Sequence, residues 1–317
     1  MRDKLCLLIC LCMYGLMNPL PGQTASPDTE AIYPAAVFAF QERSASLAGY
    51  GEKVSELLFV TLAENPKLLF VDRQEMNKIL DEHELNLSGM VNPDQAVKIG
   101  ALIGAKILIT GSVMQMDNKI YLVAKIIGTE TSRVIGASAS GSAQGEIFPL
   151  VQELATAVSE KISSQSDSLV AKPVPIDQRI AKIKAELGDR KRPSVSISVQ
   201  ERHVGQMTID PAAETELIRI CRETGFTVID SSVGNAKAAD ITISGEGFSE
   251  FGARRKNIVS VKARLEIKSV DKHTGQIIVA DRQTAVEVDL TEQIAGKKAL
   301  QSAAAIIAER LLPKLVK

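Results

Sequence analysis

The segment from Val71 to Val113 constrains the fold more than any other part of the chain. It begins in one apolar run, 68–72, and ends in another, 106–116, and both have the composition of buried strands. Between them lie two stretches with apolar residues at helical spacing, 73–84 and 92–105. A strand, two helices and a strand indicate a mixed α/β fold, and no catalytic motif occurs among these residues.

The rest of the first half supplies partners for these elements. The patterns predict strands at 35–40, 120–127 and 133–138 and helices at 44–64 and 147–163. A strand, a helix and a strand of these lengths predict a parallel pair with a right-handed crossover. The short turn at 117–119 predicts an antiparallel return.

The second half repeats this outline without the two-helix insert. Predicted strands lie at 195–199, 226–230, 238–245, 261–270, 277–280 and 286–288, and predicted helices at 211–223 and 291–312. The run Ala238–Gly245 matches Gly104–Gly111 in pattern. We interpret this as an internal duplication. The expected fold class is therefore α/β with mixed sheets, in two related units of two or three layers.

Residues 1–26 have the layout of a secretory signal peptide. Arg2 and Lys4 precede an apolar run, 5–17, and Pro and Gly residues follow it. This run is shorter than the roughly 20 residues that a membrane-spanning helix needs. Cleavage after Ser26 would leave small residues at both key positions, and an uncleaved anchor is the alternative. The expected organisation continues with an α/β domain at 27–163, a linker with a short helix at 164–192, and a second α/β domain at 193–317.

Composition agrees with an exported chain. Cys6, Cys10 and Cys12 lie in the predicted leader and Cys221 is the fourth cysteine, so no internal disulfide is expected in the processed chain. None of the early cysteines follows a small residue as lipid attachment requires. No later segment is long and apolar enough to cross a membrane as a helix. A net charge of −1 gives no support for a nucleic-acid surface. We expect the periplasm, bounded by the outer membrane.

Candidates for catalysis, cofactor binding or metal binding are weak. His83, between acidic residues, fits no metal-ligand spacing and is interpreted as part of a solvated helix face. Cys221 is interpreted as a buried structural thiol, with a nucleophile as the alternative. Gly245 and Gly247 lack the third glycine of a phosphate loop, which favours a strand end or a bulge. No catalytic, cofactor or metal site is therefore predicted.

One segment stands out as a possible protein-binding hairpin. It carries Phe248 and Phe251 in a chain with only 4% aromatic residues, and a basic cluster at Arg254, Arg255 and Lys256. A solvated hairpin tip is one interpretation. The other is a docking surface for an acidic partner or an anionic surface.

The first half also resembles a known family, the CsgG-like components of curli assembly and transport. The matching residues are Asp72-Arg73, Ile79-Leu80, Glu82, Leu85, Leu87-Ser88-Gly89, Ala96-Val97, Ile99-Gly100, Gly104-Ala105 and Thr110-Gly111-Ser112-Val113. The same fold family includes activators of penicillin-binding proteins. The resemblance implies an exported, outer-membrane-associated α/β protein of the cell envelope that works by protein–protein contacts, including homo-oligomers.

Three functions stay open from the sequence. The first is a non-catalytic envelope protein of the CsgG-like type, acting in secretion or envelope assembly. The second is a periplasmic regulator that docks on a cell-wall synthase. The third is an enzyme or small-ligand-binding protein that uses a groove between the two halves. The expected partners are accordingly envelope proteins rather than nucleic acid.

Overall fold

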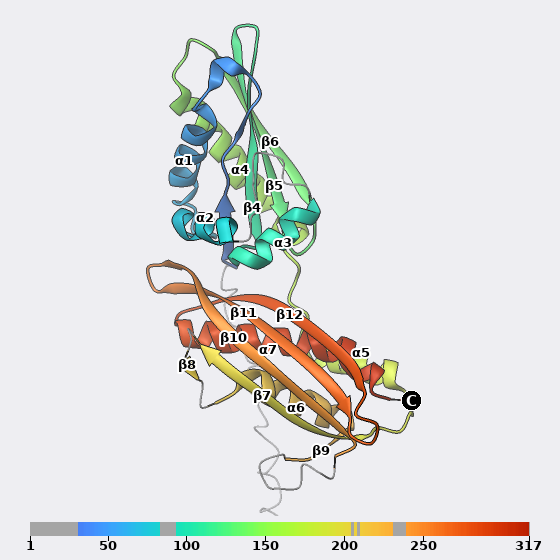
Figure 1. The fold of residues 1–317 in the computed structure, drawn as a ribbon. Helices are drawn as coiled ribbons and strands as arrows, with labels where there is room; N and C mark the ends of the chain where they lie inside the picture. Colours follow the sequence, from blue (N-terminus) through green and yellow to red (C-terminus); the bar gives the residue numbers. More distant parts are fainter. Residues whose placement is uncertain (1–30, 83–92, 204–205, 208–209, 231–238, 317) are drawn as a thin grey trace, which may run out of the picture. The chain divides into compact units, whose positions relative to one another are not determined.

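The computed structural model describes residues 31–82, 93–203, 206–207, 210–230 and 239–316. Its first half forms a mixed sheet with the strand order β3-β1-β4-β5-β6 (Figure 1). The strands are β1 (Tyr33–Val37), β2 (Gln41–Glu42, beside β4), β3 (Leu68–Phe70), β4 (Ile107–Met116), β5 (Lys119–Gly128) and β6 (Val134–Ser142). Strand β1 is parallel to β3 and β4, and β4, β5 and β6 are antiparallel. The predicted parallel pair and antiparallel return are confirmed.

Helices cover both faces of this first sheet. On one face lie α1 (Tyr50–Leu62), which follows the short 3₁₀ helix η1 (Ala45–Leu47), and α4 (Ile147–Leu169). On the other face lie α2 (Arg73–Glu82) and α3 (Pro93–Ile103). Successive residues of β1 divide between two hydrophobic clusters, because side chains alternate along a strand: Val37 packs with α1 and α4, and Ala36 with α2 and α3. The first sheet is therefore the middle of three layers.

The second half forms another mixed sheet, with the strand order β12-β11-β10-β7-β8. The strands are β7 (Ser194–His203), β8 (Gln206–Met207), β9 (Thr227–Val228, beside β7), β10 (Ile241–Arg255), β11 (Ile258–Asp271) and β12 (Ile277–Asp289). Strand β7 is parallel to β9 and β10, and β10, β11 and β12 are antiparallel. Both sheets thus share one pairing scheme, as a duplication would produce, and common descent stays a prediction.

Helices of the second half pack on one face of its sheet. They are α5 (Ile176–Leu187), α6 (Ala212–Glu223) and α7 (Glu292–Leu311), followed by the short 3₁₀ helix η3 (Leu312–Lys314). Buried residues such as Ile197, Ile243 and Leu265 pack with Leu217 and Leu300 in one cluster. Each such side chain removed from water contributes about 1.5–3 kcal/mol. The opposite face carries polar residues and a shallow hollow, so this half has two layers.

Some boundaries differ from the sequence prediction. Strand β10 continues to Arg255 as one strand of 15 residues, and β12 is unbroken from Ile277 to Asp289. Helix α4 continues through the serine-rich segment to Leu169, with one non-helical residue at Gln165. Burial explains this extension, because Leu169 is fully buried and anchors the last turn in the core.

Candidate functional site

Asp72 and Arg73, which begin the pattern shared with the CsgG-like family, have structural roles. The Asp72 carboxylate accepts a hydrogen bond from the backbone N–H of Gln74 (2.8 Å), which satisfies a donor in the first turn of α2. The Arg73 guanidinium donates to the buried Ser55 hydroxyl (3.1 Å) and lies 3.8 Å from Glu56. The two residues therefore start α2 and attach it to α1.

The glycines of this pattern act in different ways. Gly104, with φ of 74°, ends α3 in a left-handed conformation that a side chain would strain. Gly100 has ordinary backbone angles, but a Cβ there would lie 2.3 Å from the Thr129 side chain. Close approach of another segment therefore explains Gly100, and backbone conformation explains Gly104. The resembling residues thus specify the fold rather than a reactive site.

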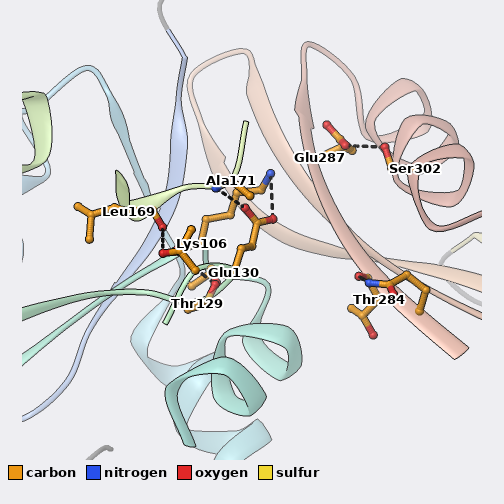
Figure 2. A network of polar contacts seen from close by, with 11 residues as sticks. Lys106, Thr129, Glu130, Leu169, Ala171, Thr284, Glu287 and Ser302 are labelled. Carbon is orange, nitrogen blue, oxygen red and sulfur yellow. Dashed lines mark hydrogen bonds and ion pairs between the residues drawn. The ribbon is translucent and has the colours of Figure 1, made fainter. Parts of the chain in front are cut away.

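A network of polar contacts joins the turn after β5 to the end of α4 (Figure 2). Glu130 lies 3.5 Å from the Lys106 ammonium and accepts from the backbone N–H of Ala171 (3.3 Å). The Thr131 hydroxyl donates to the Leu169 carbonyl (2.8 Å). Gly128 permits this approach, since a Cβ there would lie 1.9 Å from the same carbonyl. The network fixes where the chain leaves the first sheet. No pattern in the sequence had predicted this network.

The predicted protein-binding hairpin is the end of the long β10–β11 ribbon, with Lys256 in its turn at φ of 54°. Phe248 and Phe251 are 39% and 45% exposed, as the interpretation as a binding surface requires. They are three residues apart and the bulge lies only after Phe251, so their side chains point to opposite faces. Phe248 lies on the open face, between Arg202 and Arg264 in the register. The two rings do not form one patch.

Two of the three basic residues at this hairpin have partners within the chain. Arg254 lies 3.3 Å from the Glu292 carboxylate. Arg255 donates to the backbone carbonyls of Asn65 (2.6 Å) and Leu68 (3.1 Å). Lys256 is exposed at the turn. The positive charge available to an acidic partner is accordingly smaller than the sequence indicated, and the hairpin stays a prediction.

The remaining residues considered in the sequence analysis are Cys221, Gly245, Gly247 and His83. The Cys221 side chain is fully buried, and burial raises the pKa of its thiol to about 12, which supports the structural interpretation. Gly245 and Gly247 lie inside β10, where the pairing with β11 is regular, so the predicted strand end or bulge at these glycines is wrong. His83, predicted to lie on a solvated helix face, is outside the described residues. Within the described ranges, no three His, Cys, Asp or Glu side chains are grouped as a metal site would need.

A buried carboxylate that the sequence did not single out lies at the start of α6. Glu201, 2% exposed, accepts hydrogen bonds from the backbone N–H groups of Ala212 and Ala213 (both 2.7 Å) and Glu214 (3.1 Å). Burial raises the pKa of Glu201, and these hydrogen bonds oppose that shift. The alternation of apolar residues at 195, 197 and 199, continued to position 201, is the signal that could have indicated it. The carboxylate holds α6 against β7 and has the geometry of a structural cap.

A second polar contact, partly buried, joins His203 and Ser249, whose Nδ1 and Oγ atoms are 2.7 Å apart. Ser249 is 1% exposed, and a Cβ at Gly296 would lie 3.1 Å from its hydroxyl. A serine covered in this way lacks the access that a nucleophile needs. The pair therefore joins β7 to β10 beneath α7.

Comparisons with known proteins agree with the resemblance in the first half. The family model described as "Curli production assembly/transport component CsgG" matches residues 23–144. The predicted resemblance is confirmed for that part of the chain. A search of curated proteins gave no match.

Solved structures similar to this chain include the C-terminal domain of LpoB from Escherichia coli, 18% identical, with a TM-score of 0.32 over 37% of this chain and 87% of that chain. Another is the PelC dodecamer from Paraburkholderia phytofirmans, 15% identical, with a TM-score of 0.26 over 39% of this chain and 96% of that chain. No helix in the described part of the chain is long and apolar enough to span a membrane.

Proposed function

We propose that this chain is an exported, non-catalytic protein of the cell envelope that acts by binding other proteins in secretion or envelope assembly. The observation that carries the proposal is the match of residues 23–144 to a family described as an assembly and transport component. The leader-like residues 1–26 support export.

The use of polar groups also favours a binding role. Glu201 caps a helix, Cys221 is buried with a raised pKa, and Glu130 joins two segments of backbone. Each of these groups has a role in stabilising the fold. Exposed apolar side chains, Phe248 and Phe251 among them, offer contact area of the kind that protein partners bury.

Export is tested by producing the full chain with a C-terminal tag in a Gram-negative host and separating periplasm, membranes and cytoplasm. We expect processed chain outside the cytoplasm, with an N-terminus just after Ser26. A matched variant with Leu8→Arg and Leu11→Arg should keep the chain unprocessed inside the cell, because charges disrupt the apolar run of a leader. Wild-type chain that stays unprocessed in the cytoplasm, like the variant, would contradict the proposal.

The binding role is tested by crosslinking in the intact envelope of the source cell and identifying the attached proteins. Secretion or assembly proteins among them would support the proposal. A cell-wall synthase would instead support the regulator that the sequence left open. Recovery of the chain without any crosslinked protein would argue against both.

A further inference from the structure

Strand β6 forms one margin of the first sheet, and among the described residues it pairs with β5 alone (Figure 1). Its nine residues, Val134–Ser142, include no charged residue and no proline. Its register with β5 runs without a bulge. Natural edge strands are usually guarded by lysine, proline, bulges or shortness, because open backbone groups recruit other strands. Strand β6 has none of these guards.

Two hydrogen bonds identify which backbone groups of β6 point outward. The Gly128 N–H donates to Arg133 O and the Ala143 N–H donates to Asn118 O, both at 2.9 Å, at the two ends of the β5–β6 ladder. Bonded and non-bonded pairs alternate in an antiparallel ladder. Ile135, Ala137 and Ala139 therefore direct their N–H and C=O groups to β5. The alternate residues direct theirs to the open edge: Val134, Gly136, Ser138 and Ser140.

This open run is continuous and accessible. All four outward residues are exposed, and a Cβ at Gly136 would meet no atom within 4 Å. The run ends at Ser140, because the Ser142 carbonyl already accepts from the Gly145 N–H (3.0 Å).

Other sheet margins of the described residues differ from β6. Strand β3 has three residues and β8 has two. Strand β12 is long but carries Asp281, Arg282 and Glu287, and its pairing with β11 contains an irregularity. Among the edge strands of the described residues, β6 alone is both long and free of charged residues.

We propose that two copies of this chain pair through their β6 strands, antiparallel about a two-fold axis at Ala137. Val134 then lies opposite Ser140, and Gly136 opposite Ser138, so each outward residue exchanges its backbone bonds with an outward residue of the second copy. A two-fold axis brings like residues together, and an uncharged strand is what allows this without repulsion. The inference extends the proposed binding role but does not depend on export.

A charge on the neighbouring strand is Lys125 of β5, which pairs with Gly136 near the proposed axis. In the paired state the two copies of Lys125 are separated by three strand spacings, about 14 Å. This exceeds the screening length of about 10 Å at 0.1 M salt, so the lysines do not prevent association.

The test is the mass of the purified, processed full chain by analytical ultracentrifugation over a series of concentrations. We expect a concentration-dependent dimer. Ser138→Pro should give a monomer, because it removes an outward N–H that β5 does not use, whereas Ser138→Thr should still dimerise. Circular dichroism checks that each variant is folded. A monomeric wild type at every concentration, or a dimer unchanged by Ser138→Pro, would overturn the pairing and leave the envelope proposal intact.

A charge-swap pair tests the register. Gly136→Glu with Ser138→Glu places like charges opposite each other in the dimer and should abolish it. Gly136→Glu with Ser138→Lys places Glu opposite Lys and should restore it. Both double variants carry the same first substitution, so a general effect on folding would not separate them. Equal masses for the two would overturn the proposed register.

Discussion

Gly111 on β4 makes room for the ring of Phe40. A Cβ at position 111 would lie 2.5 Å from Phe40 Cε1 and 2.1 Å from the backbone oxygen of Val123. Phe40 is 4% exposed and belongs to the cluster between the first sheet and helices α1 and α4. Gly111 is one of the residues that the chain shares with the CsgG-like pattern, so this contact gives a physical reason for its presence.

The first prediction concerns Gly111→Ala. The added methyl group must displace a buried ring and the backbone of a neighbouring strand, so we expect a loss of roughly 1–3 kcal/mol in the free energy of unfolding. Gly136→Ala is the matched control, since space is open there, and it should change stability by less than about 1 kcal/mol. Urea unfolding of both variants measures this. A Gly111→Ala chain as stable as wild type would contradict the packing argument.

A second prediction concerns the ion pair of Asp281 and Arg310. The guanidinium binds both carboxylate oxygens, at 2.8 and 3.0 Å, and these hydrogen bonds hold the pKa of Asp281 below its usual value. A lowered pKa gives stability that is present above the unfolded-state pKa and is lost as pH falls through the folded-state pKa.

Asp281→Asn should therefore reduce the free energy of unfolding by about 1 kcal/mol or less near neutral pH, since both side chains are partly exposed. The difference from wild type should shrink at about pH 3, because the carboxylate is then largely protonated in the unfolded chain and increasingly so in the folded one. Urea unfolding at the two pH values measures it. A difference that grows toward acid would show that the sign is wrong.

A third prediction concerns Cys221. Burial and a pKa of about 12 leave almost no thiolate at about pH 8, so the native processed chain should react slowly with a thiol reagent. Unfolding in guanidinium should expose the thiol and restore rapid labelling. Spectroscopic titration with Ellman's reagent follows both. Rapid labelling of the native chain would favour the nucleophile interpretation instead.

A fourth prediction separates the two aromatic residues of the hairpin. Because Phe248 and Phe251 lie on opposite faces of the β10–β11 ribbon, a partner bound to one face contacts only one of them. Phe248→Ser and Phe251→Ser should therefore differ in partner recovery after crosslinking, with at least 10-fold loss for one of them if it is a binding hot spot. If both variants fold and recover the partner as well as wild type does, the hairpin is not a binding surface.

The sequence predicted most of the secondary structure and the mixed α/β class, because periodicity is local. The apolar run before Val113 becomes β4, and the helical spacing after Thr291 becomes α7, with the Thr291 hydroxyl accepting from the Ile294 N–H at 3.2 Å. The resemblance to the CsgG-like family was also visible in the sequence, and part of its pattern is local: Asp72 caps α2, and Gly104 ends α3 in a left-handed conformation. Gly100 and Gly111 are instead required by tertiary contacts, with Thr129 and with Phe40.

Only the tertiary structure decided which groups meet and which stay open. Pairing of β10 with β7 and β11 decided that Phe248 lies on the open face, between Arg202 and Arg264. Glu201 caps α6 only because the fold places the start of that helix, at Ala212, beside β7, 11 residues further along the chain. Strand β6 is an edge because no other described segment adds to the sheet beyond it. Local sequence specifies the faces of a strand, whereas its neighbours depend on distant segments, whose placement is a property of the whole fold.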